Sequence, residues 1–298
     1  MKVSDTTFEG EAAVELVTDA LRLVAVTARG PRVAFLGRPG GENLLLWKPG
    51  EYTRGDWDLS GGHRVWVTRP GADECDETYS PDNGPVELAV GGDGVGFTLT
   101  GAEDPFNRTC RGFSVRALSP ERLEVDNFVT NTGEMLYSGG VWGLTCTVPG
   151  EGTRYGIPLG DGGEWDCFSM LMFRRWAGHD GGYADGQIAI GDEMLIVTPA
   201  GRENKRMLQA QRGVIAMSDP SRSLTFAKKV SYVRGAQYPQ GCNMAFYVGP
   251  GNFMVEMETM GPEVTLSPGE TAHNIETWAL AGGADALDDV GRLVGMFG

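Results

Sequence analysis

The chain has 298 residues with 40 acidic and 25 basic side chains, giving a formal net charge of −15. A hydrophobic content of 41% is enough to fill a core, which excludes a wholly disordered chain, and the acidic balance argues against binding to nucleic acids. Glycine (45 residues) and proline (16) exceed their ordinary shares, which is typical of a chain with many turns.

Most of the chain follows a period of two, and each such run ends in a Gly, Pro, Asn or Asp turn. The predicted strands are 21–27, 31–36, 64–68, 86–90, 96–100, 112–118, 122–130, 140–148, 188–198, 213–218, 223–230, 243–248, 253–260 and 273–280. Turns recur about every ten residues, which favours an all-β sandwich or barrel over alternating strands and helices. One terminal helix is predicted over 284–297 from apolar residues at three- and four-residue intervals. Because the sequence contains no Pro/Ser-rich linker, 1–298 are predicted to form one large two-sheet domain.

Several classes of protein are argued against. No apolar run approaches the ~20 residues of a membrane span, and the acidic N-terminal segment has no apolar core of a signal peptide. Five cysteines without a CxxC pair indicate reduced thiols in a cytoplasmic protein. Three histidines give little basis for a metal site, so no metal or cofactor is predicted. The glycine-rich stretch 91–96 precedes a strand rather than a helix and therefore predicts a turn, not a phosphate loop.

The segment 57–66 (WDLSGGHRVW) is the first candidate for a ligand site. Two glycines allow a sharp turn or a close approach of the backbone to a ligand, and a His-Arg pair follows where a strand begins. The Arg64 guanidinium could donate hydrogen bonds to sugar hydroxyls, and Trp57 and Trp66 could stack on a pyranose ring. The alternative is a turn followed by an edge strand with a solvated Arg64.

The segment 253–260 (FMVEMETM) is the second candidate. In a strand, Met254, Glu256, Glu258 and Met260 share one face, which sets the two carboxylates about 7 Å apart along the strand. Flanking methionines would partly desolvate these acids and raise a carboxyl pKa towards that of a useful general base. The alternative is an ordinary solvent-facing side of a strand.

The hairpin pattern of 264–280 turns at Pro-Gly and is a structural signature. Its His273 is expected on a strand surface. The acidic balance and the paired acids predict a neutral or cationic polyol ligand rather than a sugar phosphate. Lys205 and Arg206 are the residues that could instead pair with a phosphate.

Several different segments follow one another along the chain in an order that can be compared with known families. They are 33–47, 123–133 and 141–145, then FMVE (253–256), LSPGE (266–270) and the closing TW (277–278). In this order the chain resembles the galactose mutarotase-like superfamily, which includes the aldose 1-epimerases. Bacterial members with GGHRxW, YPxGCN and ExExxGP are more similar still, matching 61–66, 238–243 and 256–262. The resemblance covers most of the chain and implies a β-supersandwich of two large antiparallel sheets.

The resemblance also implies a reaction. In aldose epimerases a glutamate takes the proton of the anomeric hydroxyl and a histidine protonates the ring oxygen, so the ring opens and recloses as the other anomer. Glu256 falls on the position of the base, with Glu258 as its neighbour, and Arg64 falls near the substrate-binding arginine. The family's histidine is missing, because 131–142 contains none. His63, Tyr238 or His179 would have to substitute for it.

Catalytic roles are accordingly expected for Glu256, His63 and Glu258. Substrate-binding roles are expected for Arg64, Trp66, Trp142, Tyr238, Lys205 and His179. The sequence therefore predicts a carbohydrate-processing protein, in first place an aldose 1-epimerase acting on a small sugar without nucleic acid or membrane. The alternatives are a carbohydrate-binding protein without catalysis, or a lyase or glycosidase that uses the same cleft.

Overall fold

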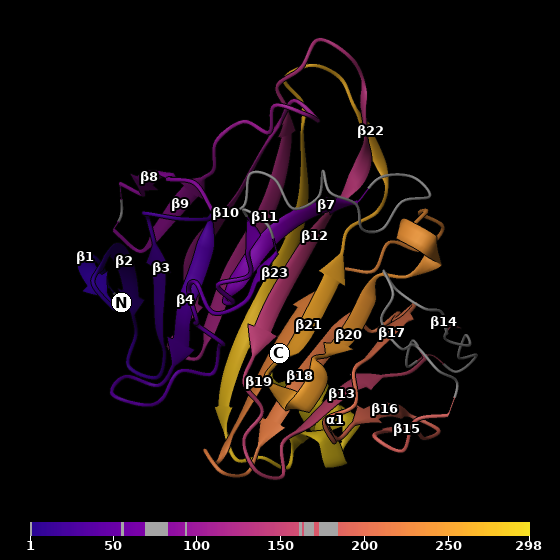
Figure 1. The fold of residues 1–298 in the computed structure, drawn as a ribbon. Helices are drawn as coiled ribbons and strands as arrows, with labels where there is room; N and C mark the ends of the chain where they lie inside the picture. Colours follow the sequence, from indigo (N-terminus) through magenta and orange to yellow (C-terminus); the bar gives the residue numbers. More distant parts are fainter. Residues whose placement is uncertain are drawn as a thin grey trace.

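The computed structural model describes residues 2–54, 57–68, 83–92, 94–160, 163, 170–172 and 184–298. Across these residues the regular structure is almost entirely β, arranged as two large antiparallel sheets (Figure 1). The predicted all-β sandwich is therefore confirmed. That 1–298 form a single domain stays a prediction.

The first sheet carries the central strands β7, β12 and β21, which come from distant parts of the chain yet lie side by side (Figure 1). In spatial order its strands are β1 (Lys2–Phe8), β2 (Glu11–Val17), β3 (Arg22–Val26), β4 (Arg32–Gly37), β7 (His63–Thr68), β12 (Tyr137–Thr147), β21 (Val255–Met260), β20 (Met244–Val248), β17 (Asn204–Leu208) and β14 (Leu171–Met172). The short β22 (Val264–Leu266) pairs with the start of β12. The central position of β21 fixes where the predicted acids lie.

The second sheet packs against the first. Its strands, in spatial order, are β15 (Ile188–Ile190), β16 (Met194–Val197), β13 (Arg154–Pro158), β18 (Val214–Asp219), β19 (Leu224–Val230), β23 (Thr271–Gly282), β11 (Arg122–Asn131), β10 (Thr109–Ser119), β9 (Gly96–Thr100) and β8 (Glu87–Val90). A separate ribbon joins β5 (Thr53–Arg54) to β6 (Trp57–Asp58). Long-range pairing of this kind makes the fold depend on contacts far apart in sequence.

The main core lies between the two sheets, because alternate residues of each strand turn inward. On β11, for example, every second residue from Leu123 to Asn131 is buried, whereas its neighbours are partly exposed. Val65 and Val67 of β7, with Val255 and Met257 of β21, belong to the same core. Trp66 lies between Val65 and Val67, and Glu256 lies between Val255 and Met257. Both must therefore face away from the second sheet.

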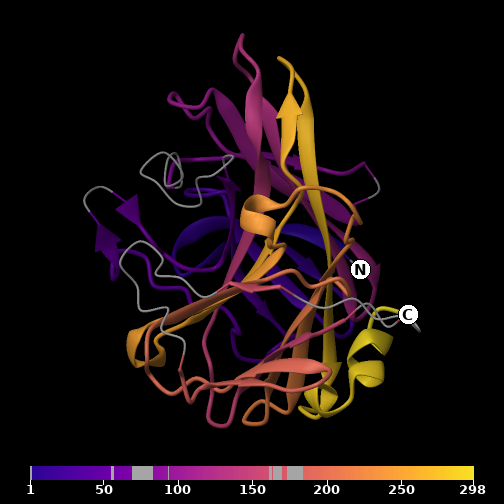
Figure 2. The same ribbon diagram turned by 90° about the vertical axis from the view of Figure 1, so that its right-hand side faces the viewer.

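The predicted terminal helix is much shorter than 284–297. The structure has a 3₁₀ turn, η4 (Ala286–Asp288), followed by α1 (Val290–Gly295), which lies on the outer side of the second sheet (Figure 2). Asp289 separates the two because its extended backbone (φ −148°, ψ 115°) breaks the helix, and its carboxylate caps α1 by accepting the Arg292 N–H at 3.0 Å. The apolar spacing of 284–297 correctly predicted a face packed against the sheet, but it did not predict the break at Asp289.

Other predictions differ only in their bounds. The predicted strand 188–198 is a hairpin, β15–β16, that turns around Gly191. Strands β1, β2, β13 and β17 were not predicted, and neither were the two-residue strands β5, β6 and β14. Two further 3₁₀ turns, η2 (Pro239–Gly241) and η3 (Pro250–Asn252), flank β20.

Candidate active site

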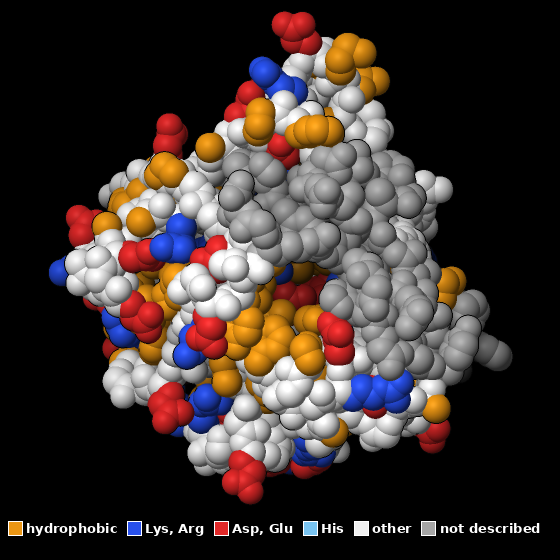
Figure 3. All heavy atoms as spheres, in the orientation of Figure 1, with side chains coloured by type: hydrophobic (Ala, Val, Ile, Leu, Met, Phe, Trp, Pro, Cys, Tyr) orange, Lys and Arg blue, Asp and Glu red, His pale blue; other side chains and the backbone are white. Residues whose placement is uncertain are grey.

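The outer face of the first sheet gathers the polar and aromatic residues of the predicted site. In the orientation of Figure 1 this face is hollowed, and apolar and acidic side chains form its visible floor (Figure 3). The outward residues, hereafter the floor, are Arg64 and Trp66 on β7, Trp142, Leu144 and Cys146 on β12, Glu256, Glu258 and Met260 on β21, Ala245 and Tyr247 on β20, and Lys205 and Met207 on β17. The prediction that Glu256, Glu258 and Met260 share one strand face is thus confirmed.

The strand register arranges the floor in rows. Trp142 lies opposite Trp66 on one side and Met260 on the other. In the next row, Leu144 separates Arg64 from Glu258. Three strands that are remote in sequence therefore bring an arginine and an acid into the same row.

A third row continues across the sheet. It runs from Cys146 through Glu256 and Tyr247 to Lys205, one residue from each of four neighbouring strands. Each acid of β21 consequently has a basic residue two strands away, in the neighbouring row. The ion pairs of the floor are diagonal for this reason.

Arg64 forms the first diagonal pair. It reaches across β12 so that its Nη2 lies 2.9 Å from Glu256 Oε1, and both side chains are almost completely buried. Its Nη1 donates to Cys146 Sγ at 3.1 Å, and that thiol donates to Glu256 Oε1 at 3.3 Å. Burial raises the pKa of the Cys146 thiol to about 12, so the group remains a neutral donor.

Lys205 forms the second pair. Its ammonium passes over the small Ala245 of β20 and lies 3.0 Å from Glu258 Oε1, while Trp142 Nε1 donates to Glu258 Oε2 at 3.0 Å. Glu258 is completely buried, and burial raises the pKa of its carboxyl to about 7. The charge of Glu256 adds to that increase, whereas Lys205 opposes it. Near neutral pH this carboxyl is populated in both its acid and base forms.

An aromatic cluster adjoins the ion pairs. The rings of Trp66 and Trp142 meet edge to face with centroids 5.7 Å apart, and Trp57 lies 6.0 Å from Trp66. The guanidinium of Arg64 stacks over Trp66 at 4.3 Å, and the Lys205 ammonium lies 4.9 Å from Trp142. Ion pairs beside aromatic rings can offer hydrogen bonds and an apolar face to the same ligand.

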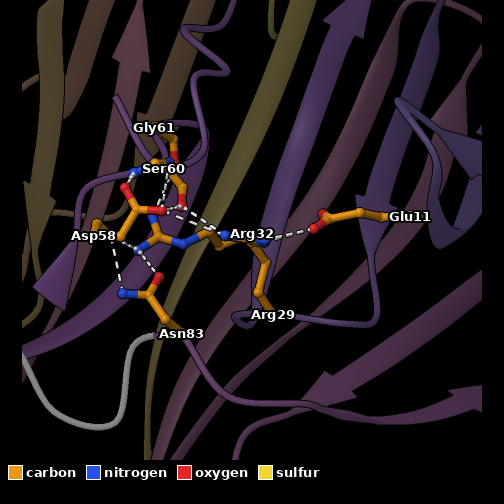
Figure 4. A network of polar contacts seen from close by, with 8 residues as sticks. Glu11, Arg29, Arg32, Asp58, Ser60, Gly61 and Asn83 are labelled. Carbon is orange, nitrogen blue, oxygen red and sulfur yellow. Dashed lines mark hydrogen bonds and ion pairs between the residues drawn. The ribbon is translucent and has the colours of Figure 1, made fainter. Parts of the chain in front are cut away.

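The loop before β7 is held by a separate network (Figure 4). Asp58 accepts hydrogen bonds from the Ser60 amide and hydroxyl, and Arg32 donates to the Gly61 carbonyl at 2.8 Å. Gly61 and Gly62 have φ of +92° and +72°, and a Cβ on either would lie within 2.3 Å of a backbone oxygen. These glycines therefore serve a tight turn that delivers Arg64 to the floor.

His63 does not join the floor, and the expectation that it would converge with Arg64 and the two acids is wrong. It precedes Arg64 on β7 and so points the opposite way, into the space between the sheets. Its ring nitrogens lie 2.9 Å from Thr145 Oγ1 and 2.8 Å from Asn127 Oδ1. Burial lowers the pKa of His63 to about 4, which leaves the ring neutral at pH 7.

Tyr238, a further expected site residue, stands apart from the acids. Tyr238 is buried, its ring stacks on Tyr232, and its hydroxyl accepts the N–H of Val233 at 2.8 Å. These contacts fix Tyr238 within its own loop rather than on the floor. His179 lies outside the described residues, so its predicted role stays a prediction.

Sequence reasoning missed two residues of the floor. Cys146 links Arg64 to Glu256, and Tyr247 lies opposite Glu256 and donates its hydroxyl to Glu203. The alternation of β20 could have indicated which face Tyr247 takes. Its pairing with Glu256 is a matter of register, which no local pattern reveals.

Other kinds of site were searched for in the described part of the chain. Within it, no group of three or more His, Cys, Asp or Glu side chains is placed to hold a metal ion. No helix of the described residues is long and apolar enough to cross a membrane.

No protein-family model matches the sequence, and no curated protein matches it significantly. Solved structures do match. A protein from Escherichia coli K12, itself only provisionally assigned as an aldose 1-epimerase, superposes with a TM-score of 0.63 at 11% identity, covering 90% of this chain and 98% of the other. A galactose mutarotase-like protein from Clostridium acetobutylicum gives a TM-score of 0.59 at 11% identity, covering 94% and 98%.

A galactose mutarotase-like protein from Lactobacillus casei gives a TM-score of 0.57 at 11% identity, with 90% of this chain and all of the other covered. Because the matches extend over nearly the whole of both chains, they establish the galactose mutarotase-like fold. The fold that the ordered sequence segments predicted is therefore confirmed. Identities this low carry no information about which reaction is catalysed.

Proposed function

We propose that this protein is a carbohydrate-processing enzyme of the aldose 1-epimerase type. The observation that carries the proposal is the placement of Glu256 beside Glu258, whose pKa is raised to about 7, next to the aromatic cluster on the outer face of the first sheet. Anomer exchange needs one group that accepts a proton and one that donates a proton under the same conditions. Two carboxyls whose environments differ can meet that need.

The roles follow from the two environments. Glu256 lies in an ion pair with Arg64 and keeps 5% of its surface exposed, so it is the carboxylate assigned to take the proton of the anomeric hydroxyl. Glu258, in its protonated form, is the group assigned to donate a proton to the ring oxygen, a step that requires its side chain, completely buried here, to become accessible to the sugar. Glu258 would take the place of the histidine that aldose epimerases use and that 131–142 of this chain does not contain.

The proton balance closes over one cycle. Removal of the anomeric hydroxyl proton by Glu256 and protonation of the ring oxygen by Glu258 break the bond between C1 and the ring oxygen and form the open aldehyde. Rotation about the C1–C2 bond exposes the other face of the aldehyde. On closure Glu256 returns its proton to the aldehyde oxygen and Glu258 recovers its own, so both carboxyls are reset.

The substrate is proposed to be a neutral aldose. Both cations of the floor, Arg64 and Lys205, already face a carboxyl group, which leaves little net positive charge for a sugar phosphate. Arg206 donates to the side chain of Asn204 and to the Lys205 carbonyl, so it does not add a phosphate ligand to this face. Trp66 and Trp142 are the rings proposed to pack against a pyranose, and because they are only 3% and 1% exposed, that contact requires them to become accessible. A cytoplasmic location is part of the same proposal.

The decisive experiment is saturation-transfer NMR on a panel of free aldoses, with hexose 6-phosphates and nitrophenyl glycosides as comparison substrates. Anomer exchange of at least one free aldose should be accelerated. Glu256→Gln and Glu258→Gln should each lower turnover by about 100-fold or more, the scale of losing a general acid or base, while sugar binding persists. Full activity in either variant would remove that residue from the mechanism.

A carbohydrate-binding protein without catalysis is the second candidate. It is favoured by the ion pairs themselves, since Arg64 and Lys205 already engage the two carboxyl groups that would have to exchange protons with the sugar. In that case aldoses would bind with no acceleration of anomer exchange. Glycoside cleavage with no anomer exchange would instead indicate a glycosidase.

A further inference from the structure

A second buried acid–base pair lies directly behind the floor. Lys228 of β19 and Glu276 of β23 both belong to the second sheet, both are completely buried, and Nζ lies 2.7 Å from Oε1. Buried ion pairs are often no more stabilising than apolar residues of the same size. Stability alone is therefore a weak reason for this pair.

The Lys228 ammonium crosses from the second sheet to the first. It donates to Thr145 Oγ1 of β12 at 3.0 Å and to the carbonyl oxygen of Met257 at 3.1 Å. Met257 is the residue between Glu256 and Glu258, so this hydrogen bond holds the stretch of backbone that sets their spacing. The charges of Lys228 and Glu258 also act on each other through the strand.

Lys228 Nζ has three acceptors, Glu276 Oε1, Thr145 Oγ1 and the Met257 carbonyl, which match the three N–H bonds of an ammonium. Burial lowers the pKa of Lys228, but Glu276, Glu258 and Cys146 all oppose that effect. Burial alone would raise the pKa of Glu276, yet Lys228, His63 and the Thr259 hydroxyl together lower it. The buried His63 is neutral at pH 7. Behind the floor there is thus one carboxylate, one ammonium and an uncharged imidazole.

Glu258 also faces charges on its own side of the sheet. They are Lys205 on β17 and Glu256 on β21, with Arg64 on β7 paired to Glu256. Lys228 therefore stands on the opposite side of β21 from the two cations of the floor. Its effect on Glu258 can be separated from theirs by substitution.

We propose that Lys228 is a positioning residue for the acidic pair: from the second sheet it fixes the Met257 carbonyl between Glu256 and Glu258 and supplies a positive charge behind Glu258. The catalytic consequence rests on the proposed function, whereas the electrostatic effect on Glu258 does not. Nothing in this role requires Lys228 to contact the substrate.

The test compares Lys228→Met with Lys228→Met/Glu276→Gln, in which no charge is left buried without a partner. The readout is the titration of the Glu258 side chain by ¹³C NMR, assigned with the Glu258→Gln variant. Loss of the positive charge makes the ionised carboxyl less favourable, so its pKa should rise by about one pH unit in Lys228→Met. The double variant should shift in the same direction but less, because a negative charge is lost as well.

Lys229→Met is the matched control, since it removes the same charge from the neighbouring residue of β19, whose ammonium lies 5.7 Å from the Phe297 ring instead. It should leave the titration unchanged. If Lys228→Met does not fold, the double variant decides. No upward shift in whichever of the two folds would overturn the proposal.

Turnover separates this proposal from the proposed function. If the enzyme is active, the pH profile of kcat/KM in Lys228→Met should move to higher pH together with the pKa of Glu258. Its kcat should fall by about tenfold with KM nearly constant. A merely structural lysine would alter stability without moving the profile. If the pKa of Glu258 shifts in the Lys228 variants but the wild-type protein accelerates no anomer exchange, the role of Lys228 is upheld and the epimerase is rejected. If the wild-type protein is active but neither the Glu258 titration nor the pH profile moves in the variants, the epimerase is upheld and the role of Lys228 is rejected.

Discussion

One lysine–glutamate pair lies on each side of the first sheet, on the floor and between the two sheets, but the outcomes are opposite. On the floor, Lys205 lies 3.0 Å from Glu258, and between the sheets Lys228 lies 2.7 Å from Glu276. Both glutamates are completely buried, yet the pKa of Glu258 is raised to about 7 whereas that of Glu276 is lowered. The same pairing therefore gives a titratable acid on one face and a fixed carboxylate on the other.

The neighbours of each acid explain the difference. Glu276 accepts hydrogen bonds from the Thr259 hydroxyl and from Trp278 Nε1, the latter at 2.6 Å, in addition to its ion pair. Glu258 has a second carboxylate, Glu256, on its own strand, and that charge disfavours its ionisation. A buried acid is thus held charged or left near neutrality by the groups around it, with burial acting the same way on both.

Breaking the inner pair should have the largest effect. Glu276→Ala leaves the Lys228 ammonium buried without its carboxylate, which should lower the free energy of unfolding by about 3–5 kcal/mol. Urea unfolding at pH 7 measures this loss. Asp126→Asn is the control, because it removes a carboxylate that pairs with the half-exposed His273, and it should cost less than about 0.5 kcal/mol. Equal losses in the two variants would contradict the comparison.

Breaking the outer pair should cost less and should depend on pH. Glu258→Gln removes the partner of the buried Lys205, and the free energy of unfolding should fall by about 2 kcal/mol at pH 8, where the wild-type carboxyl is ionised. At pH 5 the loss should be larger, because the raised pKa of Glu258 stabilises the wild-type fold below about pH 7 and the variant lacks that contribution. Lys205→Met/Glu258→Gln should recover most of it at pH 8. An identical loss at both pH values would show that Glu258 does not titrate in this range.

The titration of Glu258 should itself appear in the stability of the wild-type protein. Its folded-state pKa of about 7 lies above the ordinary carboxyl value of 4.5, so between these values the folded state binds more protons than the unfolded chain. This carboxyl therefore stabilises the fold at low pH and loses that contribution as pH rises to about 7. The difference between wild type and Glu258→Gln, followed by urea unfolding from pH 4.5 to 8, isolates the contribution. A difference independent of pH would reject it.

His63→Gln should have the smallest effect on turnover. The side chain lies between the sheets and bonds Thr145 and Asn127, both of which an amide can also reach. Anomer exchange should stay within about twofold of wild type, since no general acid or base is lost. NMR exchange rates provide the measurement. A drop comparable to that of Glu258→Gln would return His63 to the mechanism.

Much of this arrangement was accessible from sequence. Alternation in 253–260 correctly placed Glu256 and Glu258 on one face, and the ordered segments indicated the fold. The same alternation would also have separated His63 from Arg64, because adjacent residues of a strand point to opposite faces. Placing both at one site was an error in using the pattern rather than a limit of the pattern.

The sequence by itself determined the all-β class, most of the strands and which residues of each strand share a face, because these depend on a period of two and on turn residues nearby in the chain. Only the tertiary structure decided which strands are neighbours. That choice pairs Arg64 with Glu256 across 192 positions, lets Lys205 reach Glu258 over Ala245, and brings Lys228 behind Met257. The charge state of each acid follows from those neighbours and from burial, which no local segment of the chain contains.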